Sequence, residues 1–132
     1  DDKRIFPDFL SATLDKRQIS ILSDGRATRS FCYVSDAVTA ILLILLAGRQ
    51  GEAYNLGNDQ REISVNELAQ LFVALEADHA GIVSAKSADQ DYETDNPQRR
   101  KPDLEKIRRE LGYRPLIDLE SGILRTLAAY RS

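Results

Sequence analysis

The chain has 132 residues, of which 42% are hydrophobic, so it has the size and apolar content of one compact domain. Its 18 basic and 21 acidic residues leave a net charge of −3. This balance argues against a nucleic-acid binder that relies on general electrostatic attraction, and it provides no polybasic membrane anchor. The single cysteine, Cys32, and the lack of a leader-like segment favour a reducing cytoplasm.

Apolar residues at spacings of three and four predict an amphipathic helix over residues 5–16. The stretch QISIL, residues 18–22, predicts a short strand. Residues 23–25 read Ser-Asp-Gly, which is typical of a turn. After this turn, residues 28–34 are expected to be extended.

A second helix is predicted where the sequence becomes almost continuously apolar. Ser35 and Asp36 are residue types that cap helix N-termini, and Gly48 is typical of a helix end. The apolar run over residues 37–47 is about half of the ~20 residues that span a bilayer. It therefore predicts a buried helix.

The middle of the chain alternates short elements. EAYNLGN, residues 52–58, predicts a strand that closes in a turn, and GIVSA, residues 81–85, predicts another. Between them Ser64 and Glu67 have the spacing of a capping box, which predicts that a helix begins there.

The last third combines a polar loop with two helices. Residues 86–98 carry no apolar period, and long loops inside compact domains are often functional. Asp103 and Asp118 are expected to cap helices over residues 104–111 and 119–130. The sequence thus predicts an α/β domain with about five helices and three to four short strands, without internal repeats.

Residues that could perform catalysis are few. His79 has no neighbouring Asp or Cys, so we interpret it as a surface histidine. Cys32 has no partner at metal-ligand spacing and fits a buried, small apolar residue. Neither the dinucleotide fingerprint G-x-G-x-x-G nor the P-loop motif is present.

Arginines outside regular structure are the best candidates for ligand binding. Arg29 follows a turn, and Arg99, Arg100 and Lys101 end the polar loop. Guanidinium groups bind phosphate and carboxylate groups bidentately, so two such sites brought together would bind a diphosphate or an acidic sugar. The alternative is that each arginine is solvated or locally paired.

Five segments carry motifs in a familiar order: DDKRIFPDFL, DGRATRSFCYVSDAV, EAYNLGN, SVNELAQL and DNPQRRKPDLEKIRRELGYRPLIDLESGI. Together they resemble the C-terminal half of extended short-chain dehydrogenases/reductases that act on nucleotide sugars, and most of all the UDP-glucuronate decarboxylases, or UDP-xylose synthases. TRSFCYVSD is similar across epimerases, dehydratases and decarboxylases, whereas the last segment is more typical of the decarboxylase branch. The resemblance implies a substrate-binding domain over residues 1–132, without the Rossmann half.

The resemblance also implies roles for individual residues. Arg29 would hold the substrate diphosphate, and Tyr33 would support the turn that positions it. Arg100 would pair with the sugar carboxylate and is the catalytic candidate. Arg4 would face the nucleotide or the interdomain cleft, and Asp103 is a further substrate-binding candidate beside its interpretation as a helix cap. Sequence alone leaves open whether Arg99 or Arg100 faces the site.

The family binds NAD in its Rossmann domain, which also carries the Tyr-x-x-x-Lys pair. We therefore expect no cofactor and no metal on this chain, no activity from it alone, and a homodimer for the full-length enzyme. Leu22 and Ser23 replace the tyrosine and glycine that the family commonly has before the turn, which puts nucleobase selection in doubt. The resemblance implies a UDP-sugar as the substrate. The alternatives are a nucleotide-sugar 4,6-dehydratase or epimerase, a non-catalytic binding module for nucleotide sugars, and a purely structural partner.

Overall fold

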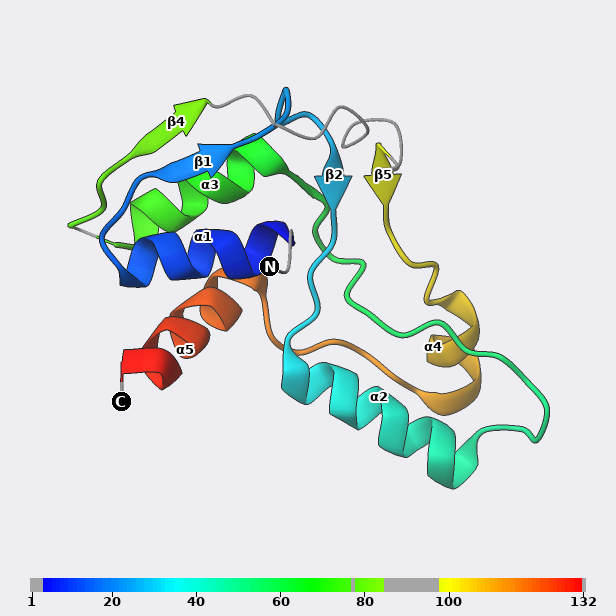
Figure 1. Ribbon diagram of the computed structural model, residues 1–132. Coiled ribbons are helices and arrows are strands. Elements are labelled where there is room, and N and C mark those ends of the chain that lie inside the picture. Colours follow the sequence, from blue (N-terminus) through cyan, green and yellow to red (C-terminus); the bar gives the residue numbers. More distant parts are fainter. Residues whose placement is uncertain (1–3, 77, 85–97, 132) are drawn as a thin grey trace.

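A computed structural model describes residues 4–76, 78–84 and 98–131, in which helices alternate with very short strands (Figure 1). The elements are α1 Ile5–Leu14, β1 Ile19–Ile21, β2 Thr28–Arg29, α2 Val34–Ala47, β3 Ile63–Ser64, α3 Val65–Leu75, β4 Ile82–Ser84, β5 Arg99–Arg100, α4 Glu105–Leu111 and α5 Leu119–Arg131. The α/β class and the five predicted helices are confirmed within the described ranges. The predicted polar loop over residues 86–98 lies almost entirely outside them.

The larger hydrophobic core lies where α1, α3 and α5 pack together beneath β1 and β4 (Figure 1). Phe72 of α3 is fully buried there, and its ring centroid lies 5.4 Å from that of Phe6 and 6.1 Å from that of Phe9, in edge-on contacts. Edge-to-face packing adds to the free energy gained by burying aromatic area. This core fixes α1 and α5 relative to α3.

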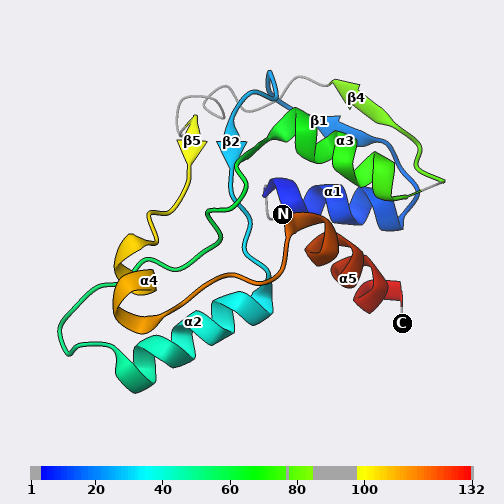
Figure 2. The same ribbon diagram turned by 180° about the vertical axis from the view of Figure 1, so that it is seen from behind.

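A second, smaller cluster joins α2 to α4, on the other side of the molecule (Figure 2). Its buried members are Ala40, Leu104, Ile107 and Tyr113. β2 and β5 lie between the two clusters, so the segments that follow them connect one cluster to the other (Figure 1).

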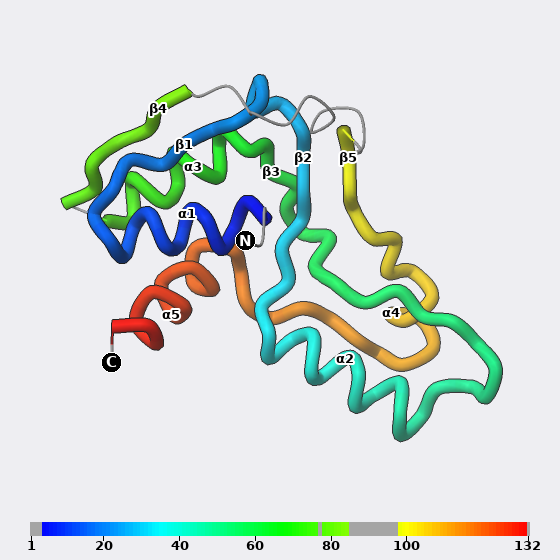
Figure 3. The backbone as a smooth tube through the Cα atoms, viewed as in Figure 1, coloured from blue at the N-terminus to red at the C-terminus, as the bar shows by residue number. Residues whose placement is uncertain are grey.

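Two small sheets complete the fold. β1 pairs with β4 in parallel, and a separate sheet has the order β3-β2-β5, with β3 beside β2 in Figure 3. β2 is antiparallel to β3 but parallel to β5, with Thr28 opposite Arg99 and Arg29 opposite Arg100. β3 and β5 are strands that the sequence did not predict.

Several local predictions are confirmed. Ser64 and Glu67 form the complete capping box of α3: the Ser64 hydroxyl accepts the Glu67 amide, and the Glu67 carboxylate accepts the Ser64 amide. The Asp118 carboxylate accepts the Ser121 amide at 2.7 Å at the start of α5. The predicted cap by Asp103 is met only in part: its carboxylate accepts the Glu105 amide at 2.9 Å, but Leu104 occupies the N-cap position of α4.

The prediction of a buried second helix is wrong. In α2 only Asp36 and Ala40 are buried, whereas Leu45 and Leu46 are 76% and 82% exposed. The run is apolar on every face of the helix, but among the described residues α4 and its neighbours cover only the side that carries Ala40. Within the described ranges, no helix is both long enough and apolar enough to cross a membrane.

Two further expectations need correction. Ser35 and Asp36 do not cap α2, because Tyr33 occupies the cap position and no side chain caps that end. Residues 52–58 do not form a strand. This segment is held instead by side-chain bonds, since the Tyr54 hydroxyl donates to Glu110 at 2.9 Å and the Asn58 amide group donates to the Ile117 carbonyl at 3.2 Å.

Candidate functional site

The β2–β5 ladder brings Arg29 and Arg100 together. They are paired in register, and paired residues of a ladder carry their side chains on the same face of the sheet. Adjacent strands lie about 4.8 Å apart, so two guanidinium groups can reach one small anionic ligand from neighbouring strands. Arg29 is half-buried, with its guanidinium donating to the Thr28 carbonyl at 2.7 Å, and Arg100 is exposed.

The opposite face of the same ladder is occupied by an ion pair. Arg99 donates to both carboxylate oxygens of Glu62, at 2.8 Å from Nε to Oε1 and 2.8 Å from Nη2 to Oε2. The Thr28 hydroxyl also donates to Glu62. These hydrogen bonds, from Arg99 first and Thr28 second, lower the pKa of Glu62 to about 2, so Glu62 is ionised at neutral pH.

The interpretation of arginines as locally paired therefore holds for many of them, and Arg100 differs. The paired ones are Arg17 with Asp15, Arg26 with Asp24, Arg49 with Glu110, Arg61 with Glu120, Arg99 with Glu62, Arg108 with Asp59, Arg109 with Glu105 and Glu110, and Arg131 with Glu76. Within residues 4–76, 78–84 and 98–131, no carboxylate forms an ion pair with Arg100. Between the two adjacent arginines, Arg100 is thus the one available to a ligand.

Arg100 and Lys101 line an open hollow of about 470 Å³ between β5, the segment after β2 and the segment before β3. Its lining residues are Ser30, Cys32, Leu56, Gly57, Asn58, Arg100, Lys101 and Pro102. The two cations on one wall favour an anionic ligand, and the described residues of the lining include no acidic side chain. We call this space the cationic hollow.

The walls of the cationic hollow are closely fitted. A Cβ atom added to Gly57 would lie 2.7 Å from Cγ of Pro102, so only glycine allows this approach. The Gly57 carbonyl accepts the Tyr113 hydroxyl at 2.8 Å, and Tyr113 is buried in the smaller cluster. Burial raises the pKa of Tyr113, so this hydroxyl stays protonated as a donor.

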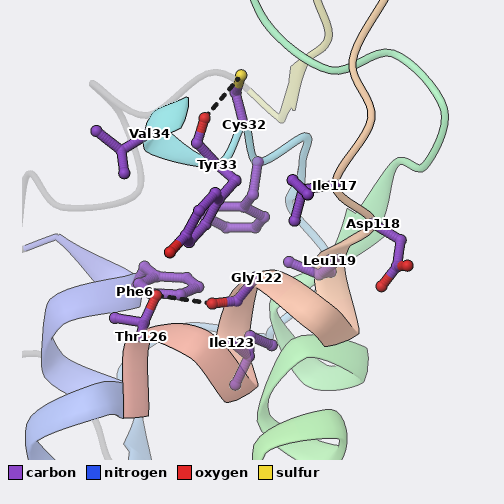
Figure 4. Close-up of a pocket in the computed structure, with 11 residues that line it drawn as sticks. Phe6, Cys32, Tyr33, Val34, Ile117, Asp118, Leu119, Gly122, Ile123 and Thr126 are labelled. Atoms are coloured by element: carbon purple, nitrogen blue, oxygen red, sulfur yellow. Dashed lines mark hydrogen bonds between the residues drawn. The ribbon is translucent and has the colours of Figure 1, made fainter. Parts of the chain in front are cut away.

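A second hollow, of about 320 Å³, is mainly apolar and lies between α1, α5 and the start of α2 (Figure 4). Tyr33 projects into it toward Phe6, and a Cβ atom at Gly122 would lie 3.3 Å from the Tyr33 ring. Arg125 lies 5.9 Å from the centroid of the same ring. Tyr33 thus belongs to this apolar hollow, whereas Arg100 belongs to the cationic one.

Cys32 lies between the two hollows and lines both. Its Sγ is 3.8 Å from the Tyr113 hydroxyl and donates to the Tyr33 carbonyl at 3.6 Å. Burial is the main cause that raises the pKa of this thiol, so it is a neutral packing group rather than a thiolate nucleophile. The expectation of a buried, small apolar residue is met only in part, because Cys32 is half-buried.

The other predicted residues lie apart from the cationic hollow. Arg4 directly precedes α1, where its carbonyl accepts the Asp8 amide at 3.3 Å. Asp103 follows the hollow's last lining residue but is engaged at the start of α4. His79 is not a free surface residue, because its Nδ1 accepts the Gly81 amide at 2.9 Å and its Nε2 lies 3.2 Å from the Thr13 hydroxyl. No cluster of potential metal ligands occurs in the part of the chain that the structure describes.

Sequence reasoning missed Glu62, Gly57 and the paired strands that place Arg100. The sequence around Glu62, which lies between Arg61 and the buried Ile63, does not indicate its role, because its partner Arg99 is 37 residues away. The close approach of Gly57 to Pro102 is likewise visible only in three dimensions.

Comparison with known proteins connects this arrangement to a family. Residues 1–57 match the family model described as the NAD dependent epimerase/dehydratase family. UDP-glucuronic acid decarboxylase 1 of Xenopus tropicalis is 36% identical over 130 residues, which are 98% of this chain and 29% of that protein. The similarity in sequence and fold relates this chain to the NAD dependent epimerase/dehydratase family and to the extended short-chain dehydrogenases/reductases.

Solved structures agree in fold. An epimerase from Methanothermobacter thermautotrophicus has a TM-score of 0.86 and 27% identity, covering 99% of this chain and 38% of that one. A dTDP-glucose 4,6-dehydratase from Streptomyces venezuelae, solved with NAD bound, has a TM-score of 0.83 and 27% identity, covering 98% and 38%. The chain thus spans between a quarter and two fifths of the relatives it matches.

Proposed function

We propose that this chain is the nucleotide-sugar-binding part of a UDP-glucuronate decarboxylase, an NAD-dependent enzyme that forms UDP-xylose and carbon dioxide. The observation that carries the proposal is the pairing of Arg29 with Arg100 on one face of the β2–β5 ladder. Arg100 and Lys101 line the cationic hollow, whereas Arg29 lies beside them on β2 and is not itself a lining residue. The 36% identity to a UDP-glucuronic acid decarboxylase is in keeping with this reaction, and a dTDP-glucose 4,6-dehydratase is 33% identical.

The two arginines would divide the ligand between them. Arg29, half-buried and held against its own strand, would bind the diphosphate through charge-assisted hydrogen bonds. Arg100, on the neighbouring strand, would pair with the sugar carboxylate, and Lys101 would add positive charge to the same wall. Tyr33 would act on the ligand only indirectly, by fixing the turn between β2 and α2.

Arg100 would do more than bind. As the carboxylate leaves, negative charge moves onto the sugar, and a cation placed beside it stabilises this charge in the transition state. NAD, which would be held by residues outside this chain, supplies the oxidation of the sugar and its later reduction. The chain's own contribution is to orient the carboxylate and to stabilise the developing charge.

A dehydratase or epimerase specificity is the second candidate, because a dTDP-glucose 4,6-dehydratase and an epimerase share the fold at 27% identity. The dehydratase in this comparison acts on dTDP-glucose, whose sugar has no carboxylate, but a UDP-glucuronic acid 4-epimerase of the same fold was solved with UDP-glucuronic acid and NAD. A preference of the site for UDP-glucuronate over UDP-glucose therefore discriminates against a dehydratase or a UDP-glucose epimerase. Release of carbon dioxide by the complete enzyme discriminates between a decarboxylase and a UDP-glucuronate epimerase.

Calorimetric titration of the chain with UDP-glucuronate and UDP-glucose tests the proposal. We expect tighter binding of UDP-glucuronate, and we expect Arg100→Gln to weaken its binding at least about tenfold while affecting UDP-glucose less. Arg17→Gln is the matched control, since Arg17 is exposed and lies between α1 and β1. Equal affinities for the two sugars, or equal losses in both variants, would contradict a carboxylate-binding role for Arg100.

A further inference from the structure

The β2–β5 ladder is too short to define its own register. Each strand has two residues, and the backbone bonds that flank the ladder run from the Thr28 amide to the Gln98 carbonyl at 2.8 Å and from the Ser30 amide to the Arg100 carbonyl at 3.2 Å. Isolated pairs of short strands are only marginally stable. An additional interaction is therefore needed to keep β5 in place.

Register matters here because side chains alternate along a strand. A slip of β5 by one residue would carry Arg100 to the opposite face and bring Arg99 or Lys101 opposite Arg29. All three residues are cations, so charge alone does not select the observed pairing. The observed register therefore requires an interaction that favours Arg99, rather than Arg100 or Lys101, opposite Thr28.

We infer that Glu62 is a positioning residue of the anion site, which holds Arg99 and Thr28 on one face of the ladder and thereby keeps Arg100 beside Arg29 on the other. Its two oxygens fit the planar fork of Arg99, which a lysine does not match. The Thr28 hydroxyl binds the same carboxylate, so Glu62 connects β2 to β5 directly. The ligand assigned to the site rests on the proposed function, whereas the register does not.

The surroundings of Glu62 support a dedicated interaction. The charged and polar groups that act on it are Arg99, Thr28 and Lys101, and its side chain is 19% exposed. The neighbouring Arg61 is engaged with Glu120 and does not compete for it. The Glu62 carboxylate is the covered partner of this pair, since the Arg99 side chain is 69% exposed. Two parallel hydrogen bonds together with the third from Thr28 restrict the geometry more than a single-contact surface pair does.

The test compares Glu62→Gln with wild type by two independent measurements. Amide hydrogen exchange at Thr28 and Ser30 reports the ladder, and we expect exchange at least about tenfold faster in the variant. Titration with UDP reports the anion site, and we expect affinity to fall about tenfold. In an Arg100→Gln background, Glu62→Gln should change UDP affinity by less than about twofold, because Glu62 acts through Arg100.

Glu52→Gln is the control, because it removes the same charge from an exposed pair with Lys106. If wild type does not bind UDP, the proposed ligand is wrong, and the exchange measurement still decides the role of Glu62. Unchanged exchange at Thr28 and Ser30 in Glu62→Gln would overturn the inference. An equal loss of UDP affinity with and without Arg100 would overturn it as well.

Discussion

Asp36 and Ile117 are 81 residues apart in the sequence, and the Asp36 carboxylate accepts the Ile117 amide at 2.9 Å. The same oxygen accepts the Leu116 amide at 3.1 Å, and Asp36 is only 5% exposed. This buried carboxylate joins the start of α2 to the segment between α4 and α5. It therefore links the smaller cluster to the connection that leads back to the larger core.

Replacing Asp36 should destabilise the fold through the two amides that it satisfies. We expect Asp36→Ala to lower the free energy of unfolding by about 1–3 kcal/mol, because the two part-buried amides lose their acceptor. Asp36→Asn keeps a carbonyl oxygen and should cost roughly half as much. Urea unfolding measures both, with the exposed Ser35→Ala as control. Equal losses for the Ala and Asn variants would show that the bonds to Leu116 and Ile117 do not matter.

Gly57 should tolerate no side chain. In Gly57→Ala the new methyl group would overlap Pro102, so the wall of the cationic hollow must shift, and we expect a loss of about 1–3 kcal/mol in unfolding free energy. Gly51→Ala is the control for backbone strain. Gly51 has a positive φ, but no atom lies within 4 Å of the added methyl group, so this variant reports strain without steric overlap. A larger loss for Gly51 than for Gly57, measured by urea unfolding, would contradict the close approach.

The acid stability of the chain should depend on Glu62. Hydrogen bonds lower its pKa to about 2 in the folded state, whereas an unfolded glutamate titrates near about 4.3. The stabilisation is therefore complete above about pH 4.3 and is lost as the pH falls toward about 2. Urea midpoints measured across this range should fall more steeply for wild type than for Glu62→Gln. Parallel curves would mean that Glu62 has an ordinary pKa.

The apolar face of α2 should contribute little to stability in this chain. Leu46→Gln should change the unfolding free energy by no more than about 0.5 kcal/mol, because Leu46 is 82% exposed. Ile107→Ala, in the buried cluster with α4, should cost about 2–5 kcal/mol. Thermal or urea unfolding of the two variants measures the difference. A large loss for Leu46→Gln would show that α2 is covered in solution.

Local chemistry was predictable from the sequence, and long-range pairing was not. The capping box of Ser64 and Glu67 involves residues three positions apart, and the Asp118 cap is equally local, so both follow from short motifs. Asp36 was misread as a cap because its true partners are 80 and 81 residues away. Two-residue strands such as β5 carry no period of their own and exist only because a partner strand is present.

In the candidate site, too, local motifs were predictable from the sequence and long-range contacts were not. A resemblance in motifs identified Arg29 and Arg100 as ligand-binding candidates, and the structure shows them paired across the ladder. The sequence did not separate Arg100 from Arg99, because the distinction depends on Glu62, which lies in another part of the chain. The ligand roles of all five candidates stay predictions: Arg4, Arg29, Tyr33, Arg100 and Asp103.

The anion site on the β2–β5 ladder is tested most directly by an NMR titration of the chain with UDP at low ionic strength, following the arginine side-chain Nε–H signals. We expect the signals of Arg29 and Arg100 to shift together along one binding curve. Those of Arg99 and the remote Arg17 should change little, since Arg99 stays paired with Glu62. Shifts at Arg99 without Arg100, or none at either Arg29 or Arg100, would contradict an anion site on this face of the ladder.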